Sequence, residues 1–303
     1  MVNITHKQTS LRQATVTAIV NVSLPATIAA IKNKTVPKGD VFEFARAAGL
    51  LAIKKTSDVI PDCHPLPVEY AAITYEVKDM QVHITVEVHT IYKTGVEVEA
   101  MHGAAITALT MYDMLKPIDK NVEISTIRLV SKKGGKTGYV NDLPGPLRIA
   151  VIVCSDTIAA GKNEDLSGKK IVEKLKGLAL TVDNYEIIPD NIEQIQTKIK
   201  GLSKDEFDMI LITGGTGLSP KDVTPEAIKP LIEREVPGIG EWMRSYGQQR
   251  MPYAMLSRSV SGFVNKSLVI AMPGSVKAVE ETMDALFPDV LHVFKVATGE
   301  RHD

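Results

Sequence analysis

The chain has 303 residues, of which 44% are hydrophobic and 23% are charged, as is ordinary for soluble globular proteins. The net charge is −1, and neither half is basic, with 16 Lys and Arg against 14 Asp and Glu before residue 147 and 19 against 22 from there on. This balance argues against a nucleic-acid partner but leaves anionic small molecules open.

The length suggests two domains, each able to bury a core. Only two cysteines occur, Cys63 and Cys154, one in each half, so we expect no disulfide framework. The N-terminal sequence MVNITHKQTS has no signal-peptide core, and no apolar run approaches the ~20 residues that span a bilayer. We therefore expect a cytoplasmic protein that makes no membrane contact.

Strands and helices are mixed in the first half of the chain. Asp40 is a plausible cap for the second helix, residues 78–79 form a predicted hairpin turn, and Pro117 ends the longest helix. Three prolines exclude regular structure from 60–67. The strands are expected at 15–22, 69–77, 81–92 and 122–131, and the helices at 25–32, 41–55 and 95–116. The pattern predicts an α+β ferredoxin-like sandwich.

Beyond a linker in the segment GYVNDLPGP (138–146), apolar strands alternate with helices. We expect domains 1–140 and 147–303, joined by a linker at 141–146. Continuous apolar strands between helices indicate a three-layer α/β fold with a mostly parallel sheet. The strands are expected at 147–154, 180–188, 209–212 and 268–272, and the helices at 167–178, 192–202, 225–235 and 276–287.

The sequence ITGGTGLSPKDVTPEA (212–227) places a glycine turn between a strand and a helix. Backbone N–H groups in such a turn face phosphate at the positive end of a helix dipole, and glycine permits close approach. Asp222 just beyond the turn could hold Mg²⁺ on phosphates. An ordinary turn with helix capping is the competing interpretation.

Two further strands of this half also end in polar turns, Cys154-Ser155-Asp156 and Pro273-Gly274-Ser275. The carboxyl ends of parallel strands meet at one edge of a sheet, where ligands bind. Because these turns converge with the glycine turn, the prediction of a phosphate site is more specific than the glycine turn alone would support. Further carboxylates lie on neighbouring loops, each of which alone could be only a cap: Asp156, Asp165, Asp190 and Asp222.

These motifs resemble the MoaB/MogA family, whose domain also occurs in gephyrin-like proteins. The matching segments are Ser155-Asp156, Asp165-x-Ser167-Gly168, Pro189-Asp190, Ile212–Gly217, Pro220–Ala227, Met255–Arg258 and Pro273–Ser275. The resemblance implies transfer of AMP from Mg-ATP to molybdopterin, with Asp222 and Asp156 in catalysis and Asp222 on Mg²⁺. It implies substrate contacts from Ser155, Asp190, Gly214, Gly215, Thr216, Gly217, Arg258, Pro273, Gly274 and Ser275. A departure from the family is Val276, where a basic residue is expected; Lys277 comes one position later.

In the first half, Cys63-His64 and Glu97-x-Glu99 raise a metal interpretation, but adjacent Cys and His do not easily share one ion. His64 could equally be structural. Asp113 and Lys116 share a helix face, and a surface ion pair is the simpler explanation for them.

Together with their neighbours these residues resemble the MoaC family, cyclic pyranopterin monophosphate synthase. The resemblance rests on Lys38–Phe42, Ile60–Leu66, Thr94–Ala100, Met111–Lys116 and Lys133–Gly138. It implies acid–base or electrostatic roles for Lys38, Asp113 and Lys116, and no tightly bound cofactor. It further implies substrate contacts from Arg12, Cys63, His64, Glu97, Glu99 and Lys136. Asn3 stands where the family has an acid.

Glu99 and Asp113 are 14 residues apart on one predicted helix, which is roughly 21 Å at a rise of about 1.5 Å per residue. One compact site from both needs two chains, so we expect a homo-oligomer. The resemblance to the MoaC family implies a hexamer, and a trimer-based assembly with threefold symmetry would suit both halves. The two resemblances together imply a bifunctional enzyme of molybdenum cofactor biosynthesis acting on pterin and nucleotide substrates. A second half that binds molybdopterin without catalysis, or a nucleotide-binding regulator, are the alternatives.

Overall fold

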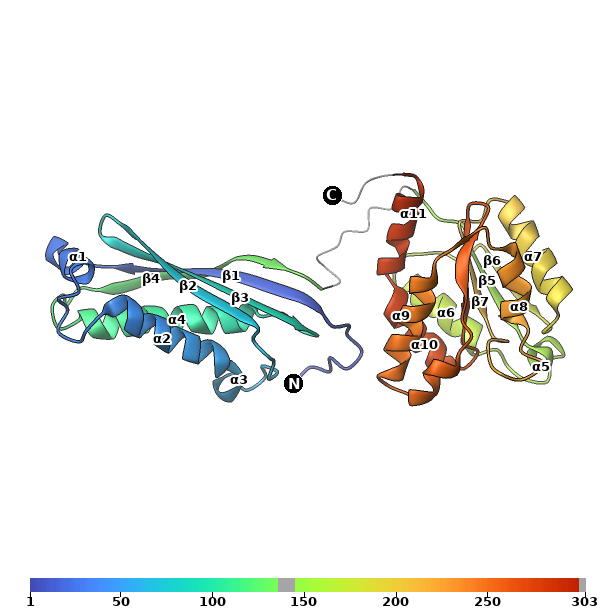
Figure 1. The fold of residues 1–303 in the computed structure, drawn as a ribbon, viewed down its shortest axis with the longest axis horizontal. Coiled ribbons are helices and arrows are strands. Elements are labelled where there is room, and N and C mark those ends of the chain that lie inside the picture. Colours follow the sequence, from blue (N-terminus) through green and yellow to red (C-terminus); the bar gives the residue numbers. More distant parts are fainter. Residues whose placement is uncertain (136–144, 300–303) are drawn as a thin grey trace. The chain divides into compact units, whose positions relative to one another are not determined.

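The computed structural model describes residues 1–135 and 145–299. The chain divides into two compact units, Met1–Val140 and Asn141–Asp303 (Figure 1). Lys136 and most of the predicted linker lie outside the described residues. Within the described ranges, no helix is both long and apolar enough to cross a bilayer.

The first unit is a four-stranded antiparallel sheet in the order β2-β3-β1-β4, with helices between the strands. Both connections out of β1 and β3 are helical, so the elements follow one another as β-α-β-β-α-β. Its elements are β1 Ser10–Asn21, α1 Pro25–Lys32, α2 Val41–Lys54, α3 Thr56–Val59, β2 Tyr70–Lys78, β3 Gln81–Tyr92, α4 Glu97–Leu115 and β4 Glu123–Lys133.

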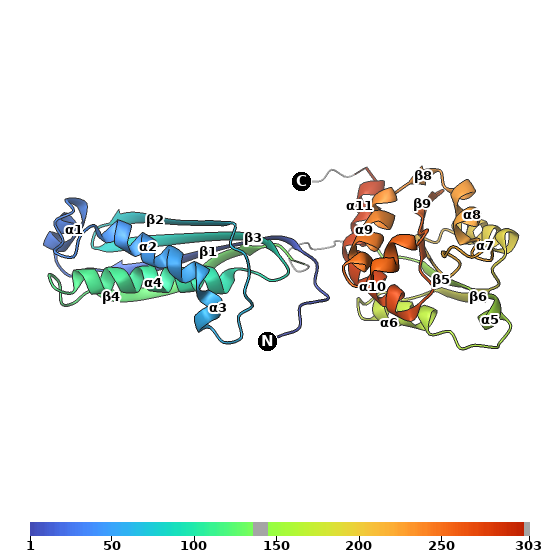
Figure 2. The same ribbon diagram turned by 60° about the horizontal axis from the view of Figure 1, so that its bottom comes forward.

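Helices α2 and α4 cover one face of this sheet (Figures 1 and 2). Alternate residues of β1 and β3 face the helices and are buried, as a half-covered sheet requires. The two helices pack closely where Gly49 faces Gly103. A Cβ at Gly49 would overlap the Thr107 side chain, and one at Gly103 would overlap Ile53. This close packing fixes α4 against α2 and the sheet.

The second unit contains a six-stranded sheet in the order β6-β5-β7-β10-β9-β8. β6, β5, β7 and β10 run parallel. At one edge of the sheet, β9 pairs antiparallel with β10, and β8 pairs antiparallel with β9. The strands are β5 Ile149–Cys154, β6 Asn184–Ile188, β7 Met209–Thr213, β8 Arg234–Glu235, β9 Ser261–Val264 and β10 Ser267–Met272.

Helices cover both faces of this sheet and make three layers (Figures 1 and 2). Residues of α6, α9, α10 and α11 share one core with the sheet, and residues of α7 and α8 share the other. The helices are α5 Asp156–Ala159, α6 Ser167–Lys176, α7 Ile192–Lys204, α8 Thr224–Ile228, α9 Pro237–Gln248, α10 Val276–Leu286 and α11 His292–Ala297, with 3₁₀ turns at Lys229–Leu231, Pro252–Leu256 and Asp289–Leu291. The predicted three-layer α/β fold with a mostly parallel sheet is confirmed.

Several sequence-based predictions of element bounds are wrong in detail, including the strand predicted at 180–188, which begins at Asn184. The helix predicted over 225–235 ends at Ile228, because Pro230 lacks the N–H that a longer helix needs; the chain tightens into a 3₁₀ turn and then forms β8. The strand predicted from residue 15 begins at Ser10. The hairpin turn lies one residue later than predicted, at residues 79–80, with Asp79 at φ 50°.

Asp119 ties the end of α4 to the corner between β1 and α1. Its carboxylate, 1% exposed, accepts hydrogen bonds from the backbone and hydroxyl of Ser23 and from Leu24, Thr27 and Asn121. Burial alone raises the pKa of Asp119, but these hydrogen bonds outweigh it and hold the pKa below its usual value. The charged form therefore stabilises the fold.

We predict that Asp119→Asn lowers the unfolding free energy of the first unit at pH 7 by about 1–3 kcal/mol. Because the folded-state pKa is depressed, this stabilisation is present above the unfolded pKa of about 3.9 and is lost as the pH falls through the folded pKa. Urea unfolding followed by circular dichroism should show a difference in unfolding free energy between wild type and variant, and this difference should become smaller below about pH 4. A difference that is independent of pH would contradict this account.

Candidate functional site

Three loops of the second unit meet because β5, β7 and β10 are parallel neighbours in the sheet. Gly214, which follows β7, has φ 98°, and a Cβ there would overlap the carbonyl oxygen of Cys154 at the end of β5. A Cβ at Gly274, after β10, would lie 3.1 Å from the Cα of Gly214. The strand ends approach so closely that side chains at these two positions would separate them.

The glycine turn Gly214–Gly217 is held from behind by Thr224. Its hydroxyl donates to the Gly214 carbonyl at 2.9 Å, and its N–H donates to the Gly215 carbonyl at 3.1 Å. Among the described residues, none accepts a hydrogen bond from the N–H groups of Gly215, Thr216 or Gly217. Neighbouring backbone N–H groups in such a turn form an anion site.

Carboxylates from two other loops face this turn. Asp156 and Asp190 bind each other's backbone N–H, at 3.1 and 3.2 Å. The Oδ1 atom of Asp190 is buried without a hydrogen-bond partner, and it lies 2.8 Å from where a Cβ at Gly215 would be. Burial raises the pKa of Asp190, and the negative charges of Asp156 and Asp222 raise it further. A cation bound here would stabilise the charged Asp190 carboxylate, and so would offset both its burial and its repulsion from Asp156 and Asp222.

The donor set fits Mg²⁺ held together with phosphate oxygens. Asp222 lies beside Gly217 and accepts a hydrogen bond from the Ser219 N–H at 2.9 Å. In the described ranges, no group of three or more His, Cys, Asp and Glu side chains is close enough to hold a metal. Mg²⁺ commonly takes one or two carboxylates and completes its shell with phosphate and water. The buried Oδ1 of Asp190 and the carboxylate of Asp222 would be such ligands.

Arg258 lies at this site, but its guanidinium binds the protein. It donates to the carbonyls of Gly217 and Asp222 and to the carboxylate of Glu226, and its backbone N–H donates to the Thr216 carbonyl. These bonds clamp the loop that carries Asp222. Ser155 and Ser275 are likewise occupied, as caps of α5 and α10.

In the first unit, Asp113 lies between two lysines at the end of α4. Its carboxylate contacts Lys38 Nζ at 2.6 Å and Lys116 Nζ at 2.8 Å. Hydrogen bonds from Lys116 and Lys38 lower the pKa of Asp113 to about 2, and Asp113 raises the pKa of Lys116. All three side chains are about half exposed. The group thus presents two ammonium ions to solvent at one place.

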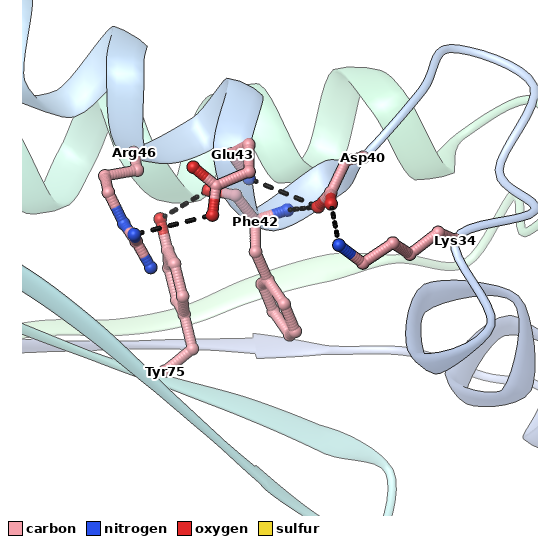
Figure 3. A network of polar contacts seen from close by, with 6 residues as sticks. All are labelled: Lys34, Asp40, Phe42, Glu43, Arg46 and Tyr75. Carbon is pink, nitrogen blue, oxygen red and sulfur yellow. Dashed lines mark hydrogen bonds and ion pairs between the residues drawn. The ribbon is translucent and has the colours of Figure 1, made fainter.

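A polar network fixes the loop that carries Lys38 (Figure 3). Asp40 caps α2 by accepting from the N–H groups of Phe42 and Glu43, which confirms the predicted cap, and it pairs with Lys34 at 2.8 Å. Tyr75 of β2 donates to the Phe42 carbonyl at 3.1 Å, and the two rings stack at 4.6 Å. The two ends of the loop are therefore tied to each other through Lys34 and Asp40, and the second end is anchored to α2 and β2.

A second group lies at the opposite end of α4. Cys63 donates to Oε1 of Glu99 at 3.2 Å, and Glu99 is 2% exposed with its Oε2 buried and unpartnered. Burial raises the pKa of Glu99, and burial together with Glu99 raises the pKa of Cys63 to about 11. The Cys63 sulfur therefore keeps its proton as the donor to Glu99 in this structure.

The other predicted residues of the first unit that the structure describes have contacts of their own. Glu97 pairs with Lys132 of β4 at 3.1 Å. Arg12 donates to the Tyr92 carbonyl and lies beside Gly135. His64 is half-buried next to Cys63; Lys136 is outside the described residues. The structure thus separates the predicted residues that it describes in this half into two groups, at opposite ends of α4.

Two residues that position these sites were not among the sequence-based candidates. Thr224 was expected only to begin a helix, and its bonds to the glycine turn depend on the path of residues 218–223. Lys132 was expected beyond the last strand, but β4 extends through it to Lys133 and brings it to Glu97. The adjacent lysines at 132 and 133 were the sequence feature that could have pointed to an ion pair here.

Comparison with known proteins follows the same division of the chain. The MoaC family matches residues 1–135, and a family described as a probable molybdopterin binding domain matches residues 150–292. The molybdenum cofactor biosynthesis bifunctional protein of Chlorobaculum tepidum is 37% identical over 281 residues, covering 93% of this chain and 89% of its own length. Its counterpart from Synechococcus elongatus is 38% identical, covering 88% of each chain.

Two shorter proteins each match one half. The cyclic pyranopterin monophosphate synthase of Nitratidesulfovibrio vulgaris is 44% identical over 140 residues, which is 46% of this chain and 86% of its own length. The crystal structure of MoaB from Thermus thermophilus is 36% identical and covers 52% of this chain and 99% of its own, with a TM-score of 0.48.

We predict that Arg258→Lys weakens binding of a Mg²⁺–nucleoside triphosphate on the order of tenfold, or about 1.4 kcal/mol. A lysine cannot bind two carbonyls and a carboxylate as the planar guanidinium does, so the Asp222 loop would lose its clamp. Titration calorimetry measures the change. Arg148→Lys, which also removes a guanidinium–carbonyl bond but lies before β5, is the matched control. Equal affinity of R258K and wild type would show that the clamp is irrelevant.

Proposed function

The chain belongs to the bifunctional molybdenum cofactor biosynthesis proteins, and from this premise we propose that its units catalyse two different steps of that pathway. The first unit forms cyclic pyranopterin monophosphate, and the second adenylylates molybdopterin. The proposal is supported by two electrostatically different sites, one built from paired side-chain charges and one from backbone N–H groups. The helix and strand order of the first unit supports its description as a ferredoxin-like sandwich.

In the first unit, the proposed substrate is (8S)-3',8-cyclo-7,8-dihydroguanosine 5'-triphosphate. A substrate oxygen attacks the α-phosphorus, the bridging P–O bond breaks, and pyrophosphate leaves as the cyclic phosphate forms. Lys38 and Lys116 would stabilise charge or transfer protons, and Asp113 keeps them at one place. Arg12, His64 and Lys136 would contact the triphosphate; Cys63, Glu97 and Glu99 would contact the guanine-derived ring.

These residues make one site only if two chains contribute, because the two groups lie at opposite ends of α4. The solvent side of α4 carries exposed apolar side chains that suit such contact: Val98, Met101, Leu109 and Tyr112. Phe44 and Leu51 extend this surface onto α2. We therefore propose a homo-oligomer, trimer-based or hexameric, in which subunits share the first site.

In the second unit, the terminal phosphate of molybdopterin would attack the α-phosphorus of ATP, forming a P–O–P bond while the bond to pyrophosphate breaks. Such a transfer needs positioned phosphates and charge neutralisation but no protein nucleophile. The N–H groups of Gly215–Gly217 would bind phosphate oxygens, and Mg²⁺ would supply positive charge beside Asp222 and Asp190. Asp156 holds Asp190 in place. The unpartnered, buried Oδ1 of Asp190 is the observation that carries this assignment.

Two substitutions in the full chain test the assignment. Lys116→Ala removes an ammonium ion from the first site, and we expect pyranopterin formation to fall at least ~100-fold with adenylylation unchanged. Asp222→Asn removes a Mg²⁺ ligand, and we expect AMP incorporation into molybdopterin to fall ~100-fold with pyranopterin formation unchanged. If wild type bound molybdopterin but transferred no AMP, the second unit would be a binding domain without catalysis.

Mixing two inactive variants tests the shared site. If Lys116 of one subunit works with Glu99 of its partner, a pair made of K116A and E99Q chains contains one intact site. Random exchange of subunits should then restore roughly a quarter of wild-type pyranopterin formation, since half of the pairs are mixed and each has one good site of two. No recovery after demonstrated subunit exchange would place both groups in a single-chain site or in separate sites.

A further inference from the structure

His102 is a half-buried histidine of α4 that the proposed chemistry of the first unit does not use. It follows Glu99 by three residues, so the two side chains are neighbours on one helix face, with Cβ atoms roughly 5–6 Å apart. Glu99 is 2% exposed; its Oε1 accepts from the Cys63 thiol, and its Oε2 is buried without a partner. A buried carboxyl group thus has an imidazole beside it, one turn along the helix.

A hydrogen bond with Thr56 orients the His102 ring. The Thr56 hydroxyl lies 3.1 Å from the carbonyl oxygens of Ala52 and Ile53, and 3.2 Å from Nδ1 of His102. The hydroxyl has one proton, and a carbonyl can only accept it, so the Thr56 oxygen accepts from the imidazole. This network assigns a proton to Nδ1 whether the ring is neutral or charged, and the ring becomes an imidazolium when Nε2 also takes a proton.

The other charged side chains around this part of α4 are paired, as far as the structure describes them. Glu97 pairs with Lys132 at 3.1 Å. On α3, which packs beside α4, Asp58 pairs with Lys55 at 3.0 Å, and both side chains are more than half exposed. β1 and β3 present alternate apolar side chains to α4. His102 is therefore the positive group whose charge acts on Glu99 from the same helix face.

Opposing effects set the protonation of Glu99. Burial raises its pKa, and the negative charge of Glu97 raises it further. Hydrogen bonds from its own backbone N–H and from Cys63 lower the pKa, as does the charge of His102. Burial outweighs the others, so the carboxylate takes up a proton at a higher pH than an ordinary glutamate does.

We propose that His102 is a positioning residue of the first site, whose imidazolium keeps Glu99 a carboxylate for the guanine-derived ring in weakly acidic solution. The inference rests on the proposed function of the first unit. A guanine-type ring presents a ring N–H next to an exocyclic amine, and a carboxylate accepts from both, whereas a protonated carboxyl group loses one of these acceptors. Protonation of Glu99 therefore weakens binding of the ring and leaves the charged group at Asp113 unchanged.

The sign of the effect follows from the two titrations. An imidazole carries its charge below about pH 6.5, and a carboxylate is lost as the pH falls through its pKa. Removal of the His102 charge would raise the pKa of Glu99, so Glu99 would take up its proton at a higher pH. The loss of binding is thus confined to the acidic side, and above about pH 7.5 the neutral ring has no such effect.

His102→Asn in the full chain tests the proposal. The Asn side-chain N–H replaces Nδ1–H as the donor to Thr56, but the amide cannot become charged. We expect the KM for the cyclised dihydroguanosine triphosphate to rise about fivefold at pH 5.5 and to stay within 1.5-fold of wild type at pH 8. The kcat should be unchanged at both values, because the variant acts on ring binding through Glu99.

His89→Asn is the matched control. His89 also lies beside a carboxylate, Glu87 at 2.7 Å, but on the face of the sheet opposite to α4, so its loss should change the KM at neither pH. An unchanged KM of H102N at pH 5.5, or an equal rise at pH 8, would overturn the proposal.

The dissociation constant of GTP, measured by titration calorimetry without Mg²⁺, provides a readout that needs no turnover. Guanine has the same two donors, so H102N should weaken GTP binding at pH 5.5 in the wild-type background but not in E99Q, where residue 99 cannot titrate. Equal weakening in both backgrounds would show that His102 does not act through Glu99. If the wild-type chain formed no pyranopterin, the proposed function would fail, and this pair of measurements would still decide the role of His102.

Discussion

The second unit depends on one steric constraint, the contact of three strand ends at the carboxyl edge of its sheet. β5, β7 and β10 are hydrogen-bonded neighbours, so the loops that follow them have no room for side chains at Gly214 and Gly274. This packing leaves backbone N–H groups as the polar surface of the turn. The carboxylates of the site are Asp156 after β5, Asp190 after β6 and Asp222 beyond the glycine turn that follows β7. Thr224 and Arg258 hold the turn and the Asp222 loop from outside, so the site is rigid before any ligand binds.

The candidate site of the first unit is built differently, because its polar groups are side chains and not backbone N–H groups. At one end of α4, Asp113 lies between two solvent-exposed lysines, Lys38 and Lys116, and holds their ammonium groups together. At the other end, Glu99 and Cys63 share a buried hydrogen bond, and the pKa of each is raised. A charged end suits charge stabilisation and proton transfer, and a buried end with an unpartnered carboxyl oxygen suits the polar edge of a ring. The close α2–α4 packing at Gly49 and Gly103 keeps both ends on one straight element.

Much of this organisation could be predicted from the sequence, because its signals are local. Apolar strands ending in glycine turns predicted the parallel sheet and the meeting of its loops, and Asp40 was recognised as a cap. What the sequence could not show depends on contacts between distant segments. Helix α9 was not predicted because the glycines of PGIGEWMRSYG weaken the helical pattern. The cavity of about 250 Å³ that α9 lines together with α10 was therefore not predicted either. Arg258 was expected to contact substrate, whereas its direction is set by the loop carbonyls that it binds.

A crystal structure of the chain with Mg²⁺ and a non-hydrolysable ATP analogue tests the central claim most directly. The account places the phosphates against the N–H groups of Gly215–Gly217, with the metal beside Asp222 and Asp190. A nucleotide bound with its phosphates elsewhere, or with the metal away from both carboxylates, would contradict it.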